Sequence, residues 1–282
     1  MSAHTKIGGA WKDVATIHAK VGGTWKEITE GHTKIGGTWK QFYANLAPLT
    51  VDYLVIAGGG GGHGFSSGIE WGAGGSGGGF TDASLTASTS TNYTVTIGAG
   101  GSGGAVSSAG TVGGDSVFSG VTSNGGNGGA AAERLGGSGD GGNNAPIAST
   151  ASPFDTMWGG LGEESSLSGT ALKYAGGGSY GNANPGQYGE PANWGKNYGG
   201  GWAYENAGVQ ITPAVNRSGG GYGGYGSGQG GSNGGSGIVI IKYPDIYTIT
   251  VGAGLTYDPP ITDGAFKITV LKSGTGNVSW AA

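Results

Sequence analysis

Serine and histidine are the residue types in this chain that could carry out catalysis or bind a metal. Four serines lie in the G-x-S-x-G pattern of hydrolase nucleophiles, at Ser76, Ser102, Ser179 and Ser232. Since 70 of the 282 residues are glycine, such patterns arise by composition, and none of the four follows a predicted strand and opens a helix, as a nucleophile elbow requires. We expect no catalytic residues and no enzymatic activity.

Three histidines recur at a constant interval, at His4, His18 and His32. Three imidazoles around one axis could bind a transition metal. Each of these histidines is flanked by Thr or Ala and by Lys, which is typical of a solvated strand, so we expect no metal and no cofactor. His63 stands alone in a run of glycines and is expected to be a loop residue. The chain has no cysteine, which excludes disulfides and cysteine metal sites.

Aromatic residues gather in residues 143–217, where Asn, Gly, Pro and Ser separate nine rings. Rigid rings among small polar residues are typical of binding loops, because Tyr and Trp provide contact area at low entropic cost. The alternative is that about half of these rings cap a scaffold that has few side chains of its own. The candidates for receptor contact are Phe65, Trp71, Trp158, Tyr180, Tyr188, Trp194, Tyr198, Trp202 and Tyr204.

The elements that must position these rings are dominated by glycine tracts. Residues 51–244 begin and end with apolar runs at 51–57 and 238–243 that predict strands, and residues 93–97 predict a third. Glycine destabilises an α-helix by about 1 kcal/mol per residue relative to alanine and offers no side chain to pack in a sheet. We therefore predict a bundle of polyglycine II-type helices, whose free backbone groups bond to neighbouring segments and whose missing Cβ atoms permit close approach. The predicted fold class is mostly β plus this helix bundle.

The N-terminal residues contain a motif repeated three times, at residues 4–12, 18–26 and 32–40. A Gly-Gly pair lies between two short alternating runs in each copy, which is typical of a tight hairpin. We predict a β-meander over residues 1–43, with Trp11, Trp25 and Trp39 in a shared small core. This module contains six lysines and three acidic residues, whereas the remainder of the chain has a negative net charge. The module is therefore expected to dock onto something acidic.

Three domains are predicted: a three-repeat β module at 1–45, a glycine-rich domain at 51–244 and a C-terminal β segment at 245–282. The last segment alternates at 245–251 and 265–271, with a further strand at 277–280. Because so short a segment cannot build a core alone, it must pack on the glycine-rich domain or on sister chains. Exposed apolar edges predict a homo-oligomer, in particular a trimer.

Charge and hydropathy exclude other classes of partner. A net charge of −4 with 11% charged residues predicts no nucleic acid partner. The apolar runs are much shorter than the roughly 18 residues of a membrane span, and no signal pattern opens the chain. We expect synthesis as a soluble protein in the cytoplasm of the producing cell.

Residues 51–62 and 235–243 resemble the opening and closing of the glycine-rich domain of tailed-bacteriophage fibre and tail proteins, and the KIGGTWK repeats resemble N-terminal modules of such proteins. The chain is similar, more distantly, to T-even-type tip adhesins, in which end loops of a polyglycine II sandwich contact the host. Those adhesins attach through a different N-terminal domain. For this chain the adhesin resemblance implies contact loops near residues 65–71 and 154–204.

The resemblance implies a non-enzymatic virion subunit, a tail fibre or adhesin, made in the host cytoplasm. Its partners would be other tail proteins, through the N-terminal module, and a host surface glycan or outer-membrane protein. A purely structural tail connector or decoration protein is the main alternative. An ice-binding protein is a further alternative, since glycine-rich polyproline II bundles also occur there.

Overall fold

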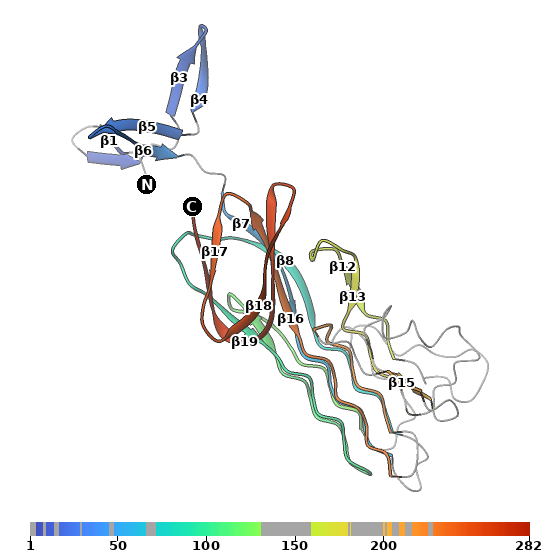
Figure 1. Cartoon of the computed structure of the whole chain (residues 1–282). Coiled ribbons are helices and arrows are strands. Elements are labelled where there is room, and N and C mark those ends of the chain that lie inside the picture. Colours follow the sequence, from blue (N-terminus) through green and yellow to red (C-terminus); the bar gives the residue numbers. More distant parts are fainter. Residues whose placement is uncertain are drawn as a thin grey trace. The chain divides into compact units, whose positions relative to one another are not determined.

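The computed structural model is a chain of β-strands and extended segments in two compact units, Met1–Pro48 with Ala282 and Leu49–Ala281 (Figure 1). The structure describes residues 4–7, 10–13, 17–28, 30–44, 48–65, 72–130, 159–179, 181, 200, 202–204, 209–211, 216–224 and 228–282. None of these residues forms a helix, and so none of the described elements is a helix that could cross a membrane.

The first unit consists of three β-hairpins. The pairs are β1 (His4–Ile7) with β2 (Ala10–Asp13), β3 (Ile17–Val21) with β4 (Thr24–Ile28), and β5 (Glu30–Ile35) with β6 (Thr38–Ala44). Gly22 and Gly23 turn the second hairpin with φ of +58° and +86°, as a two-residue type I′ turn requires, which confirms the expected tight turn.

The three hairpins form three separate two-stranded sheets in the described part of the unit, rather than the expected continuous meander. The expected tryptophan core is also wrong for Trp25, whose side chain is 67% exposed. A two-stranded sheet lacks a second layer to cover its faces, and therefore cannot bury a ring on its own. The side chains of Trp11 and Trp39 lie outside the described residues.

The second unit is built on one antiparallel nine-stranded sheet, in the order β11-β10-β9-β19-β16-β7-β8, with β17 and β18 also paired to β19. Its strands are β7 (Thr50–Ile56), β8 (Phe80–Thr86), β9 (Tyr93–Ile97), β10 (Ser116–Phe118), β11 (Val121–Ser123), β16 (Ile238–Pro244), β17 (Thr248–Val251), β18 (Leu255–Asp263) and β19 (Phe266–Ala281). The last three come from the C-terminal residues, and β19 pairs with four other strands.

This sheet is a nearly closed barrel, because its two edge strands approach one another. Thr81 Oγ1 on β8 lies 2.8 Å from Ser123 Oγ on β11. Beside them, the Gly79 amide donates to the Asn124 carbonyl at 2.7 Å. The curvature brings the two edges together and leaves the inward side chains enclosed.

The barrel interior holds the main hydrophobic core. Trp280 is 1% exposed and packs edge-on against Tyr93 and Tyr243, with ring centroids 5.4 and 5.9 Å apart. Inward residues of β7 alternate with outward ones, and the outward Leu54 and Ile56 are buried too. They lie in a second cluster with Tyr174, on the hairpin of β12 (Glu163–Ser165) and β13 (Leu172–Tyr174). Burial on both faces explains why residues 53–57 and 238–241 are continuous apolar runs.

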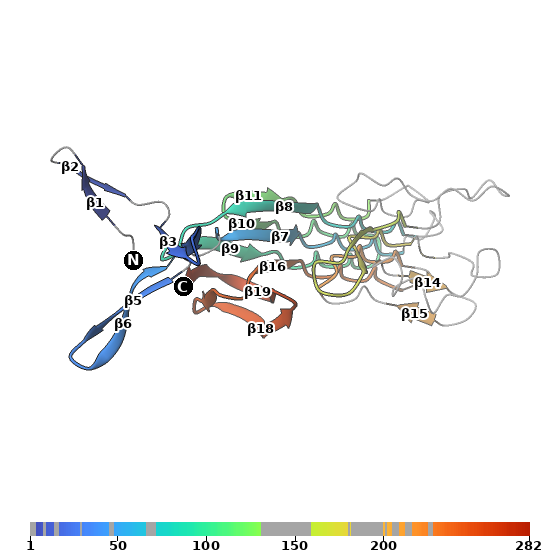
Figure 2. The same cartoon turned by 90° about the horizontal axis from the view of Figure 1, so that it is seen from above.

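Six glycine-rich segments continue six barrel strands beyond the sheet, at residues 57–65, 72–79, 98–105, 108–115, 124–130 and 228–237. Both views show them running side by side from the barrel (Figures 1 and 2). Residues 175–179 and 218–224 join the same set through backbone hydrogen bonds. We call these eight segments the glycine array.

The predicted helix bundle is therefore wrong as a description of the fold, which is all-β among the described residues. The physical reason is that the chain leaves the barrel strands already extended. Its backbone groups bond between segments, as the sequence predicted, but they do so from extended segments that continue the strands. The expected lateral bonding and close backbone approach are both observed.

Candidate recognition site at the end of the glycine array

Residues 57–65 form the centre of the glycine array, and their amides donate to three neighbouring segments in turn. Gly58, Gly61 and Gly64 donate to the carbonyls of Gly114, Thr111 and Ser108, each at 2.9 Å. The amides one residue further on donate to residues 235, 232 and 229. The remaining third, at residues 57, 60 and 63, donate to residues 79, 76 and 73. The pattern repeats every three residues, and the three acceptor segments run antiparallel to the centre.

The carbonyls of the same segment accept from three further segments. Those of Gly58 and Gly61 accept from residues 126 and 129, those of Gly59 and Gly62 from residues 101 and 104, and those of residues 60 and 63 from residues 221 and 224. These segments run parallel to the centre. Residues 57–65 are thus held by bonds to six neighbours, which fixes them against sliding and bending.

Glycine is needed in the array because neighbouring backbones touch. A Cβ on Gly61 would lie 2.0 Å from the Ser102 carbonyl oxygen, and one on Gly62 would lie 1.9 Å from that of Tyr222. No side chain tolerates such distances. The array is therefore a scaffold that cannot carry contact residues at these inner positions, which leaves its flanks, ends and connections for recognition.

Phe65 lies at the end of the array away from the barrel. Its amide donates to Gln229, its carbonyl accepts from Ser107, and its side chain is half-buried. The turn at residues 105–108 and the ends of the segments at Gly129 and Gly224 lie at the same level, because they bond to residues 61–65. This group of one turn and several segment ends, which we call the tip, is the candidate recognition site.

Most of the other aromatic candidates lie outside the described residues: Trp71, Trp158, Tyr180, Tyr188, Trp194 and Tyr198. Trp202 and Tyr204 are described for their backbone, in β14 (Trp202–Tyr204), which pairs with β15 (Val209–Ile211). Chain connectivity relates several candidates to the tip, since the stretches 66–71 and 131–158 begin directly after Phe65 and Ala130. The structure does not bring the nine side chains together as one described surface.

His63 differs from the expected loop residue. Its side chain is 2% exposed and lies inside the array. Its Nδ1 contacts the Gly64 carbonyl oxygen. Its Nε2 has no hydrogen-bond partner among the described residues. The sequence did not indicate that this side chain is buried, because the glycines around it show no apolar periodicity.

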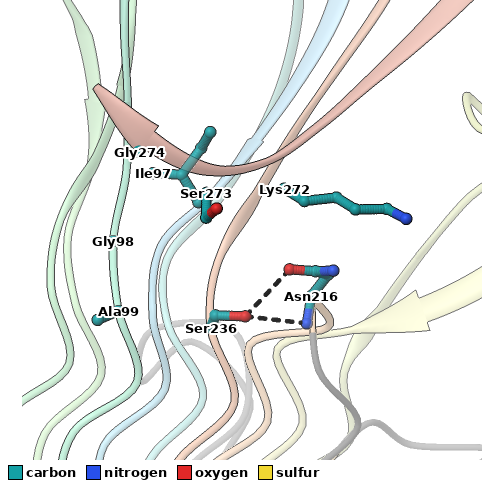
Figure 3. A pocket seen from close by; sticks show the side chains of 8 residues that line it. All are labelled: Ile97, Gly98, Ala99, Asn216, Ser236, Lys272, Ser273 and Gly274. Carbon is teal, nitrogen blue, oxygen red and sulfur yellow. Dashed lines mark hydrogen bonds between the residues drawn. The ribbon is translucent and has the colours of Figure 1, made fainter. Parts of the chain in front are cut away.

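A pocket of about 390 Å³ lies where the barrel meets the array (Figure 3). Ser236 Oγ donates to Asn216 Oδ1 and accepts from the Asn216 amide, both at 3.1 Å. The Lys272 ammonium lies 2.6 Å from Asp258 Oδ1. Asn216 has φ of +60°, a conformation that asparagine tolerates better than most residues. These polar groups are engaged with one another, so the pocket is best explained as a junction between the two layers.

The titratable groups of the second unit do not form a catalytic cluster among the described residues. No group of three or more metal-ligating side chains occurs in the described part of the chain, and His18 and His32 are exposed. Burial raises the pKa of Tyr174 and of Tyr243, against the opposing effect of a hydroxyl hydrogen bond on each. Both tyrosines belong to apolar clusters and are structural.

Comparison with known proteins finds one family, and its match covers the glycine array. No curated protein matches the chain in sequence. Residues 33–244 match the family described as glycine-rich domain, and this stretch includes the whole array and the strands β7 to β16. On that match, the chain belongs to the glycine-rich domain family.

Proposed function

We propose that this chain is a non-enzymatic subunit of a bacteriophage tail fibre, an adhesin that presents its tip to the host surface. The observation that carries the proposal is the glycine array, in which six segments hold residues 57–65 by backbone bonds of 2.7 to 3.0 Å. The resemblance of residues 51–62 and 235–243 to phage fibre proteins provides the setting. The receptor would be a surface glycan or an outer-membrane protein.

The array suits this role because its hydrogen-bonded segments form a rigid scaffold, while other parts of the chain are left to bind the receptor. Its inner positions exclude side chains, so substitutions that change specificity must occur elsewhere, for example in the connections. Those connections carry most of the aromatic candidates. Loops on a rigid scaffold are a common arrangement for binding, because the scaffold lowers the entropy lost on contact.

Alanine substitution of Trp158, Trp194 and Trp202, one at a time, tests this proposal. We expect each change to weaken adsorption of the particle to host cells, with truncation of a true contact residue costing about 2 kcal/mol or more, roughly thirtyfold in affinity. Melting temperature and assembly should stay unchanged. Val112→Ala is the matched control, because this apolar side chain is exposed on the flank of the array.

A normal adsorption with a large loss of stability in all three variants would show that the rings support the scaffold. In that case the adhesin assignment of these connections is wrong.

A structural tail connector is the second candidate, and the exposed apolar side chains of the first unit favour it. Val21, Trp25 and Ile35 are each more than half exposed, as residues that contact another protein would be. Protease access to residues 131–158 in the assembled particle separates the two functions. Cleavage there in intact particles supports an adhesin, and complete protection supports a connector.

A further inference from the structure

Three neighbouring segments form one side of the glycine array, residues 98–105, 108–115 and 124–130, which we call the outer flank. In these segments every exposed residue carries a side chain, and every other residue is a glycine. In the first and third segments the exposed positions recur every third residue, at 99, 102 and 105 and at 124, 127 and 130. The side chains of the outer flank therefore lie on its solvent side, and its glycines face the rest of the array.

Two adjacent amides of the outer flank donate to side chains and not to another segment. The Ser102 amide donates to Thr111 Oγ1 at 2.7 Å. The Gly103 amide donates at 2.8 Å to Oδ1 of Asn233, an exposed residue of the adjoining segment. Thr111 and Asn233 thus occupy donors that a further extended segment would otherwise use. Native proteins block exposed sheet edges for the same reason, to prevent pairing with another chain.

Elsewhere the array continues into a further layer. The Gly178 amide donates to the Gly75 carbonyl and the Gly220 amide to the Gly176 carbonyl, both at 2.8 Å. A Cβ on Gly178 would lie 2.1 Å from the Gly221 carbonyl oxygen. Extended glycine segments therefore add to the array where no side chain stands between them.

A side chain at an outer position prevents such an addition. Hydrogen-bonded backbones in the array leave no space for a Cβ, since one on Gly103 would lie 2.0 Å from the Gly231 carbonyl oxygen. A backbone that bonded to the outer flank would meet the side chain of Ser102 or Asn127 in the same way. A second copy of this chain is the partner that these side chains exclude, because it carries the same extended glycine segments.

We propose that the side chains of the outer flank close the glycine array to further extended chain, and that a second copy of this chain would dock there through its own array if they were absent. The closure keeps copies from associating side by side through their glycine segments. An oligomer of this chain would then be held together by other surfaces. The inference goes beyond the proposed function and does not depend on it.

Sedimentation velocity of the full-length chain over a series of concentrations tests this proposal. The opened variant carries Ser102→Gly, Thr111→Gly and Asn233→Gly, which remove three exposed side chains and, with them, both acceptors. The matched control carries Thr111→Val and Asn233→Leu, which remove the same acceptors but keep the bulk of the side chains. We expect the opened variant to self-associate about tenfold or more tightly than the unmodified chain, and the control to behave like the unmodified chain.

Thermal melting shows whether each variant is folded. A folded opened variant that associates no more tightly than the unmodified chain would overturn the proposal. An equal gain in the control would overturn it too, because the lost hydrogen bonds, and not access for a second backbone, would then cause association. If the opened variant has no melting transition, Ser102→Gly/Thr111→Gly, which retains Asn233, is judged by the same result. None of these results affects the tail-fibre function, which adsorption to host cells tests.

Discussion

Substitution of a single inner glycine should strongly destabilise the second unit. In Gly61→Ala, the new Cβ would lie 2.0 Å from the Ser102 carbonyl oxygen, where ordinary contact begins at 3.4 Å. The carbonyl must therefore move by well over an ångström. The Ser102 carbonyl accepts the Thr111 amide at 2.9 Å, so this displacement breaks that hydrogen bond.

The cost follows from these contacts. Overpacking costs about 1 to 3 kcal/mol, and the loss of a hydrogen bond between two residues that are exposed to water adds about 0.5 to 1.5 kcal/mol. The total is about 1.5 to 4.5 kcal/mol, whereas the stability of a typical domain is about 5 to 15 kcal/mol. The free energy of unfolding should therefore fall by a substantial fraction of its value.

Gly264→Ala is the matched control for this substitution. Gly264 has φ of +61°, but a Cβ there meets nothing within 4 Å, so the change costs only the left-handed conformation, about 1 to 2 kcal/mol. Denaturant unfolding followed by tryptophan fluorescence measures both variants. Equal losses in Gly61→Ala and Gly264→Ala would refute the claim that close backbone approach holds the array together.

Further substitutions test the barrel and its junction with the array. Leu271→Ala should cost about 2 to 5 kcal/mol in denaturant unfolding, because the residue is fully buried, whereas Ile261→Ala at a 52% exposed position should cost little. Ser116→Ala should cost about 1 to 3 kcal/mol, since its Oγ accepts the buried Gly98 amide at 2.9 Å; an unchanged melting temperature would contradict this. Burial raises the pKa of Tyr243, so its contribution to stability is complete below about pH 10 and is lost as the pH rises further, when the unfolded chain ionises first. Tyr243→Phe should flatten this alkaline loss, and an identical pH profile for both proteins would rule the explanation out.

The strands that the sequence predicted best are those with strong apolar patterns. Residues 51–57, 93–97 and 238–243 match β7, β9 and β16 within one residue at each end. Strand β18 was missed because its nine residues include Pro259 and Pro260, and proline is a signal against a strand. Both prolines fall between Asp258 and Ile261, where the register of pairing with β19 shifts, so neither has to donate a hydrogen bond to the sheet.

Long-range pairing decided the extent of β19. The sequence predicts two short strands, at 265–271 and 277–280, because glycines interrupt the alternation. The structure has one strand of 16 residues, since Gly274 and Gly276 pair with Ile97 and Val95 of β9. Partners that lie far away in the chain provide the bonds that local propensity does not.

The sequence predicted what kind of residues would form the candidate site, but not where in the fold the site would lie. The composition indicated aromatic loops on a glycine scaffold, but the sequence does not show that residues 61–65, 105–108, 129 and 224 meet at one tip. Trp25 shows the same limit in the first unit. Its alternating neighbours predict a buried ring, and the absence of a second layer in the described part of that unit leaves it exposed.

The sequence alone determined the hairpin repeats, the apolar barrel strands and the need for glycine backbones to bond to other segments, because turn geometry, alternation and the missing Cβ act locally. The tertiary structure alone decided that the glycine segments continue barrel strands and, where described, form no helices. An extended glycine backbone satisfies its amides and carbonyls only through other segments, and residues 57–65 do so with six of them. The order of those neighbours depends on the closing of the barrel, which no local pattern encodes.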